Sequence, residues 1–289
     1  MNRQAIAGLV IMIGSEAATL AGVAPFPTWN TPLCWTGFLL FADGIVWRAR
    51  HDSWIHGAPR EFAGLAALSI PLWLVFEFYN LYIDNWHYVG LPLHPGLRLL
   101  GYAWSFATIW PAIFVGAELV ATWRGATPPD DLRAGPSQAR ALGPGLWGVV
   151  ATGVALLLWP LAAPSPYLAA PVWLGFILLL DPINFGAGRE SLIGDLRHGQ
   201  STRLVNLAVS GLLCGVLWET WNYWAGAKWH YTVPIMENFR VFEMPLPGYL
   251  GFPAFALECF TMYVFVRGAA LGLWKRAGGG AARTRRIGL

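Results

Sequence analysis

Charged residues are scarce in this chain of 289 residues. Lys, Arg, Asp and Glu together make up 12% of it, against about 25% in an ordinary soluble domain. Hydrophobic residues make up 56%, and the mean hydropathy is +0.47. This composition excludes a soluble globular protein and indicates an integral membrane protein.

Cysteine and clustered histidine are scarce as well. The three Cys are scattered in apolar stretches, which excludes a disulfide framework and a zinc site of paired cysteines. The six His are also scattered, so the spacing of a membrane di-iron oxygenase is missing. No Gly-rich phosphate loop or dinucleotide fingerprint occurs, and the sequence PPDD at 128–131 lacks the second carboxylate motif of a diphosphate–magnesium site. We expect no metal and no cofactor.

Long apolar runs are abundant. Runs near 20 residues, the length of a transmembrane helix, occur at eight places in the sequence. We therefore predict an all-α polytopic membrane protein with eight transmembrane helices. Their expected positions are roughly 5–24, 32–48, 62–84, 99–122, 145–163, 168–184, 204–225 and 248–273.

The two halves of the sequence resemble each other. WTGFLLFAD (Trp35–Asp43) matches WLGFILLLD (Trp173–Asp181), and FEFYNLYIDNWHYV (Phe76–Val89) matches WETWNYWAGAKWHY (Trp218–Tyr231). Because each half would hold four spans, an even number, the halves share one orientation. We predict a tandem, parallel repeat of a four-helix unit. Its parts are a first repeat (1–123), a cytoplasmic linker (124–144), a second repeat (145–275) and a disordered basic tail (276–289).

Positive charges are unevenly distributed along these spans. Of the 19 Lys and Arg, only Arg98, Lys228 and Arg240 fall on one side of the predicted membrane. By the positive-inside rule, both termini are expected in the cytoplasm and the chain in the cell (inner) membrane. We interpret the basic tail, GGGAARTRR, as a positive-inside anchor and expect no nucleic-acid partner.

Several carboxylic acids fall within the apolar runs, where an ionised side chain costs roughly 2.5–3.5 kcal/mol. Glu77 and Asn80 share one face of a helix, as do Glu219 and Asn222. Equivalent helices related by a pseudo-two-fold axis would bring these faces together. We interpret Glu77 and Glu219 as acid and base candidates, oriented by Asn80 and Asn222 and supported by Glu258 in the last span.

Aromatic residues near these acids would wall a site. An acid inside an apolar aromatic cage suits protonation of an alkene and stabilisation of the resulting cation. Two other interpretations stay open: the polar groups are interhelical hydrogen-bonding glue, and the Trp-His-Tyr triplets are interfacial aromatic belts. The predicted substrate-binding residues are Tyr79, His87, Trp218, Trp221, Trp224 and His230.

The stretch WETWNYWAGAKWHY…MPLPGYLGFPAFALECF, from Trp218 to Phe260, resembles the integral-membrane lycopene cyclases of bacteria, archaea and fungi. Those proteins have two similar multi-span units, each with a helix-borne acid, aromatics and a Leu-Pro stretch before an acid-containing helix. The resemblance implies that Glu219 and Glu258 are the acids of one unit, and Glu77 and Glu118 those of the other. The implied activity is proton-initiated cyclisation of an isoprenoid polyene, without redox change.

We therefore expect a membrane enzyme that cyclises or isomerises a carotenoid or related isoprenoid. Its partners would be this hydrophobic isoprenoid or lipid substrate and the membrane lipids. A proton- or cation-coupled transporter is the alternative, because parallel repeats and buried acids suit it equally. A non-catalytic membrane subunit that binds pigment or lipid is a third. The oligomeric state stays open.

Overall fold

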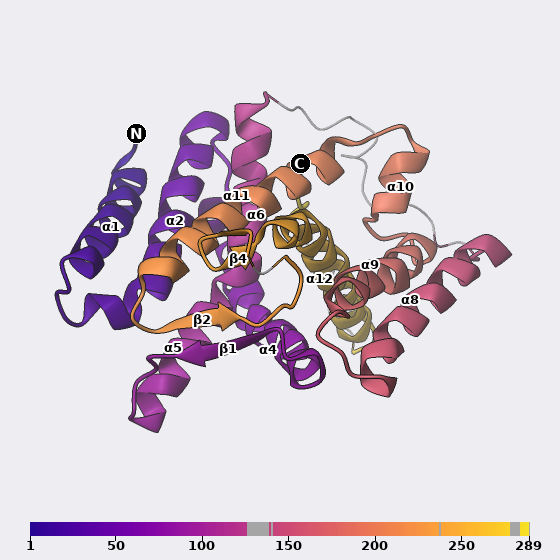
Figure 1. Ribbon diagram of the computed structural model, residues 1–289. Helices are drawn as coiled ribbons and strands as arrows, with labels where there is room; N and C mark the ends of the chain where they lie inside the picture. The colour runs from indigo at the N-terminus through magenta and orange to yellow at the C-terminus, as the bar shows by residue number, and fades with distance from the viewer. Residues whose placement is uncertain (126–138, 140, 237, 278–283, 289) are drawn as a thin grey trace.

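The computed structural model describes residues 1–125, 139, 141–236, 238–277 and 284–288, which are mostly helical (Figure 1). The long helices are α1 (Arg3–Leu20), α2 (Phe26–Arg50), α4 (Pro59–Ile83), α5 (Pro95–Ala107), α6 (Ile109–Trp123), α8 (Pro144–Ala162), α9 (Ala169–Gly186), α11 (Thr202–Trp224) and α12 (Gly251–Arg276). The short helices are α3 (Trp54–Gly57), α10 (Leu192–Arg197) and the 3-10 helix η1 (Leu246–Leu250). The strands are β1 (Trp86–Val89), β2 (Lys228–Tyr231), β3 (Arg240–Val241) and β4 (Met244–Pro245).

Seven of the eight predicted apolar runs each coincide with one helix, and the fourth, 99–122, falls on the two consecutive helices α5 and α6. Helices α1 and α2, at the first two predicted spans, are 18 and 25 residues long but are not apolar enough to be among the candidate membrane spans. Six segments of the described residues are long and apolar enough to cross a membrane, as expected of a membrane protein. They are Pro59–Ile83, Pro95–Trp123, Pro144–Ala162, Ala169–Gly186, Thr202–Trp224 and Leu246–Trp274.

The expectation of an all-α fold is corrected at two short β-ribbons. Strand β3 pairs with β4, and β1 pairs antiparallel with β2. The register of the β1–β2 pair places the two Trp-His-Tyr triplets opposite each other, with His87 opposite His230 at the centre. Helix α4 ends before the first triplet because Asp84 takes a left-handed conformation, with φ of 48°. The triplets are therefore partners in one ribbon, although they lie in different halves of the chain.

An asparagine near the end of each preceding helix fixes the start of this ribbon. Asn80 donates to the carbonyl of Trp86 at 2.8 Å and accepts from its amide at 3.2 Å. Asn222 makes the same two bonds to Trp229, both at 2.9 Å. The second half has one more residue between Asn and Trp, yet its Asn side chain binds the same two backbone groups of the Trp. The hydrogen bonds described for both side chains therefore run to backbone groups, and they do not orient the glutamates as predicted.

Each half also contains a pair of helices in close backbone contact. A Cβ atom added to Gly8 in α1 would lie 2.4 Å from the carbonyl oxygen of Gly37 in α2. One added to Gly153 in α8 would lie 2.8 Å from the carbonyl oxygen of Gly175 in α9. Only glycine leaves room for such an approach. Gly37 and Gly175 are matching residues of the sequence repeat, so matching positions make matching contacts.

The repeated aspartate binds the start of a short helix in each half. Asp43 accepts from the amide of Ile55 in α3 at 2.9 Å. Asp181 accepts from the amides of Leu192 and Ile193 in α10, both at 2.8 Å. A carboxylate is favourable there because the first amides of a helix lack partners within it.

The described end of the chain docks against the bundle, and the predicted disordered basic tail is corrected for residues 284–288. Arg285 donates through Nε and Nη2 to the two oxygens of Glu118 in α6, at 2.6 and 3.0 Å. Arg203 of α11 donates to the carbonyl of Ile287 at 2.9 Å, and the Ile287 side chain is buried. The segment is ordered because buried acids pair with its guanidinium group. Figure 1 shows both ends of the chain on the side of the bundle away from the β1–β2 ribbon.

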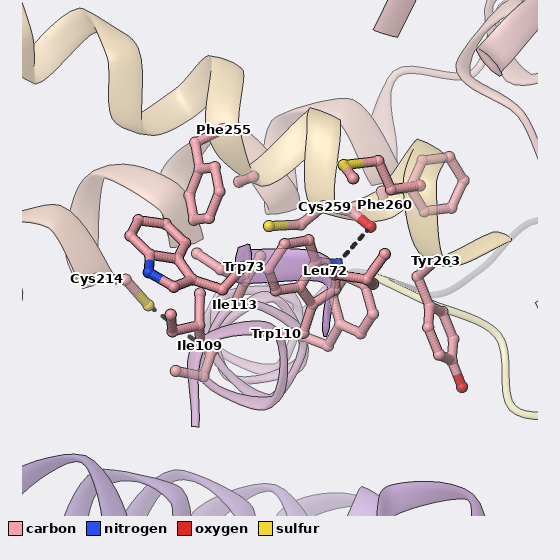
Figure 2. Packing of buried hydrophobic residues seen from close by; sticks show 14 of the residues in the cluster. Leu72, Trp73, Ile109, Trp110, Ile113, Cys214, Phe255, Cys259, Phe260 and Tyr263 are labelled. Carbon is pink, nitrogen blue, oxygen red and sulfur yellow. Dashed lines mark hydrogen bonds between the residues drawn. The ribbon is translucent and has the colours of Figure 1, made fainter. Parts of the chain in front are cut away.

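Aromatic side chains join the two halves at the centre of the bundle (Figure 2). Trp110 of α6 donates its indole N–H to the carbonyl of Cys259 in α12 at 2.9 Å. The rings of Trp73 in α4 and Phe255 in α12 meet edge to face, with centroids 5.9 Å apart. The three cysteines are free and buried, as expected of small core residues. This core borders the cavity described next, because Trp73 and Phe255 belong to both.

Candidate functional site

A cavity of about 450 Å³ lies between the β1–β2 ribbon and the helical core. Helices α2, α4, α5, α9, α11 and α12 contribute to its wall together with the ribbon. Its surface is mostly apolar and aromatic, which suits a hydrophobic ligand. Seven tryptophans line it: Trp29, Trp35, Trp73, Trp86, Trp173, Trp218 and Trp229.

The alternation of side chains along the ribbon decides which residues face this cavity. Successive residues of a strand point to opposite faces, so the first and third residues of each triplet share a face. These four aromatic residues all line the cavity: Trp86, Tyr88, Trp229 and Tyr231. The middle residues, His87 and His230, occupy the other face with ring centroids 5.8 Å apart. Neither histidine lines the cavity, although both were predicted to bind substrate.

Glu77 lies behind the cavity wall and accepts three hydrogen bonds on one oxygen. The donors are the hydroxyl of Tyr88 at 2.5 Å and the indole N–H groups of Trp73 at 2.7 Å and Trp86 at 3.4 Å. All three donors line the cavity. Three donors on one oxygen match an ionised carboxylate, because it only accepts hydrogen bonds. Glu77 has the environment of a base.

Glu219, the matching acid of the second half, is fully buried in a different environment. Its Oε1 accepts from the hydroxyl of Tyr231 at 2.8 Å. Its Oε2 has no hydrogen-bond partner within the described part of the chain, although the backbone amides of Glu243 and Met244 lie near the carboxyl group. A buried carboxyl oxygen without a donor suits the neutral, protonated form, because an unpaired buried charge is costly. Glu219 therefore has the environment of an acid.

Two tyrosines connect these carboxyl groups to the cavity. Burial raises the pKa of Tyr88 well above its ordinary value of 10, and the charge of Glu77 adds to the effect. Burial raises the pKa of Tyr231 in the same way, with a further contribution from Glu219. Both hydroxyls thus keep their protons at neutral pH. Each can pass a proton between its carboxyl group and a molecule in the cavity.

The other predicted aromatic residues are divided between the cavity and its surroundings. Trp218 lines the cavity, and its ring lies 5.8 Å from that of Trp73. Trp221 and Tyr79 are buried outside the lining, and Trp224 is half exposed on α11. The structure therefore brings one of the four predicted aromatic residues to the cavity.

Glu258 is fully buried in α12 and does not line the cavity. Neither of its carboxyl oxygens has a hydrogen-bond partner among the described residues. Its charge would act on the hydroxyl of Tyr79 in α4. Glu258 is thus a second buried acid with the environment of a neutral group, at a different place.

The repeated Trp-His-Tyr triplets stood out in the sequence, but Tyr88, Tyr231 and most of the lining tryptophans were not predicted as site residues. A signal was present, because residues two apart in each triplet would share a face if the triplet were a strand. The interpretation as helix ends concealed it, since a helix distributes three consecutive residues around its axis.

The described residues contain no group of three or more His, Cys, Asp or Glu that could hold a metal ion. No protein-family model matches the chain, and no curated protein and no solved structure matches it either. The chemistry of the cavity is therefore the basis for inferring a function.

Proposed function

We propose that this chain is an integral-membrane enzyme that cyclises or isomerises an isoprenoid polyene by proton transfer. One observation carries the proposal: two cavity-lining tyrosines, one from each half, each donate to a glutamate that lies outside the cavity lining. The two carboxyl groups have opposite environments, which suits one acid and one base. The tryptophan faces around them would stabilise a carbocation.

The reaction begins at Glu219. The Tyr231 hydroxyl, which donates to Glu219 at rest, first turns toward the substrate and accepts from the protonated Glu219 instead. A proton then passes from Glu219 to Tyr231 while Tyr231 gives its own proton to an alkene carbon, which leaves a cation on the neighbouring carbon. In a cyclisation the cation adds to a second double bond and closes a ring. In an isomerisation the carbon skeleton stays unchanged. A C–H proton beside the cation then passes to Tyr88 while Tyr88 protonates Glu77, and a new double bond forms. Substrate and product have the same formula. Between turnovers, Glu77 gives its proton to bulk water and Glu219 takes up a proton from bulk water.

The resemblance to the membrane lycopene cyclases agrees with this chemistry and also limits it. Two units with matching acids around an apolar cavity support the same reaction class. The paired acids that those enzymes have directly after Leu-Pro are absent, because Gly248 and Tyr249 follow Leu246-Pro247 here. We therefore propose the reaction class, proton-initiated rearrangement of an isoprenoid, and a substrate that need not be lycopene.

The proposal includes eight membrane spans in two parallel four-helix repeats. Matching glycines between α1 and α2 and between α8 and α9 support it, as do the matching aspartates that bind α3 and α10. Helices α1 and α2 would then be spans like their counterparts α8 and α9. Positive residues concentrate at the end of the bundle away from the ribbon, which supports cytoplasmic termini and the cell (inner) membrane.

The test is mass spectrometry of total lipid extracts from cells that make linear carotenoids and other polyprenyl lipids. Cells expressing the natural chain should contain a product of unchanged mass and altered retention. Cells expressing Glu219→Gln should lack it, and cells expressing Glu258→Gln should keep it. An unchanged lipid profile with the natural chain would overturn the proposal.

A proton-coupled transporter is the second candidate, and Glu258 is the observation that favours it. A fully buried carboxyl group whose two oxygens lack partners in the described part of the chain could bind and release a proton during transport. The test is proton flux into liposomes that contain the purified protein. Flux that depends on Glu258 but not on Glu219 would support transport and contradict the enzyme proposal.

A further inference from the structure

We propose that the substrate of this cavity carries an anionic head group, which Arg98 binds at the edge of the cavity. The inference rests on the proposed function, because it specifies the class of isoprenoid that the enzyme would take. The chain of such a substrate would lie among the tryptophans, and its phosphate or carboxylate oxygens would lie at Arg98. A hydrocarbon carotenoid has no such head group.

The charges on the cavity wall are the first observation. Arg98 and Lys228 both line the cavity, and no Asp or Glu of the described residues does. These two cations belong to the three that fall on this side of the predicted membrane, where positive residues are rare. The wall therefore presents positive charge to whatever occupies it.

The two cations differ in what they can offer a ligand. The ammonium group of Lys228 lies 3.3 Å from the carboxylate of Glu243. Burial alone would raise the pKa of Glu243, but the neighbouring His230 and Lys228 have the larger effect and lower it. The Lys228 charge is therefore balanced. Arg98 is exposed, and it donates through Nε to the carbonyl of Pro92 at 3.2 Å. No carboxylate of the described residues forms an ion pair with Arg98, so its guanidinium group can bind oxygens bidentately.

The positions along α5 place Arg98 at a useful distance from the reacting groups. Tyr102 lies one helical turn beyond Arg98, and both line the cavity. The ring of Tyr102 meets that of Tyr88 edge to face, with centroids 5.4 Å apart. The path from Arg98 to Tyr88 is thus on the order of 10 Å, from one turn of helix and one ring contact. A prenyl chain held at Arg98 by its head group would pass Tyr88 and its partner Glu77.

Ligand titrations followed by tryptophan fluorescence test this inference, because seven tryptophans line the cavity. The purified full chain in neutral detergent would be titrated with geranylgeranyl phosphate and with geranylgeraniol, which has the same chain and no charge. We expect the phosphate to bind about tenfold more tightly, as for a hydrogen-bonded ion pair. Arg98→Gln should abolish this preference and leave the affinity for the alcohol unchanged. Arg240→Gln, a cation on the same side that does not line the cavity, should keep the preference.

Each other result has a definite meaning. Equal affinities for phosphate and alcohol in the natural chain, or a preference that survives Arg98→Gln, would overturn the head-group inference and leave the proposed function standing. A lack of binding by both ligands would contradict the proposed function as well. A diacyl phosphatidate of similar charge separates a prenyl ligand from an ordinary membrane lipid. Weaker binding of the phosphatidate supports the inference, and equal binding would contradict it.

Discussion

The two halves of the chain place matching acids in different surroundings. In the first half, Glu77 accepts three hydrogen bonds and Glu118 is held by the guanidinium group of Arg285. In the second half, one oxygen of Glu219 and both oxygens of Glu258 have no hydrogen-bond partner among the residues that the structure describes. The first-half acids therefore have the partners of carboxylates, and the second-half acids have the surroundings of neutral carboxyl groups.

This difference shows how a repeated sequence can give two roles. A symmetric pair of sites would hold two equal acids and could not separate proton donation from proton acceptance. The extra indole donors of Trp73 and Trp86 at Glu77 have no counterpart at Glu219, which breaks the equivalence. Environment rather than residue type thus assigns acid and base.

The largest effect is expected for Glu219→Gln. The amide cannot supply a proton, so the rate of product formation should fall about 10³-fold, within the range for general acid catalysis. The free energy of unfolding should change by less than about 1 kcal/mol, because Gln keeps the shape and can still accept from Tyr231. Product formation in membranes and denaturant titration in detergent measure the two quantities.

Glu258→Gln is the matched control for that variant, because Glu258 is also a buried second-half acid but, among the described residues, its carboxyl group has no hydrogen bond to a residue that lines the cavity. Its rate should stay within about threefold of the natural chain, less than the smallest effect expected for a lost general acid. Equal losses in the two variants would contradict the assignment of Glu219 as the proton donor.

A large loss of stability is expected for Glu118→Ala. Removal of this carboxylate leaves Nε and Nη2 of Arg285 without their partner at a mostly buried position, while Asp52 still binds Nη1. The free energy of unfolding should fall by about 3 kcal/mol, the lower end of the range for a broken buried pair. Activity per folded molecule should change little, because the pair lies away from the cavity. Denaturant titration measures the loss. A double variant that also carries Arg285→Ala should recover part of it, and no recovery would show that the pair is not coupled.

A moderate loss is expected where the helices touch through glycine. Gly8→Ala should lower the free energy of unfolding by about 1–3 kcal/mol, because the added methyl group meets the backbone of α2. Gly153→Ala in the second half should lose a similar amount. Gly14→Ala is the control, since nothing lies within 4 Å of its added Cβ. Loss in one half only would contradict the repeat.

The smallest effect is a pH dependence outside the membrane-spanning segments. Burial would raise the pKa of Glu190, but Arg203 and Arg267 outweigh burial and lower it. Because the pKa is lower in the folded state, the carboxylate stabilises the fold fully at pH values above 4.5, its ordinary pKa. This stabilisation should be lost as the pH falls below 4.5 through the folded-state value. Melting temperatures measured from pH 7 to pH 3 should decline over that interval, and less steeply in Glu190→Gln.

The positions of the helices could be predicted from the sequence because apolar runs of sufficient length have few alternatives in a membrane protein. The matching glutamates were also predictable as groups within the helical bundle, since they lie on apolar helices. Their connection to the cavity was not, because it depends on Tyr88 and Tyr231 and thus on the pairing of strands from different halves. The partners of Asn80 and Asn222 followed from the same unpredicted ribbon.

The docking of residues 284–288 was unpredictable for a related reason. A basic stretch near the end of a chain has no hydrophobic periodicity, and its composition is typical of disorder. Its order depends on Glu118, an acid that lies far away in the sequence and has no local signal for this role. Long-range charge pairing of this kind requires the folded arrangement of the helices.

The most direct test of the central claim, that Glu219 protonates the substrate through Tyr231, is an assay in D₂O. The purified chain would be incubated with linear carotenoid and polyprenyl lipids, and the products analysed by mass spectrometry. The account predicts one deuterium for each ring closed or double bond moved, and no product with Glu219→Gln or Tyr231→Phe. A product without deuterium, or the same labelled product from Glu219→Gln, would contradict it.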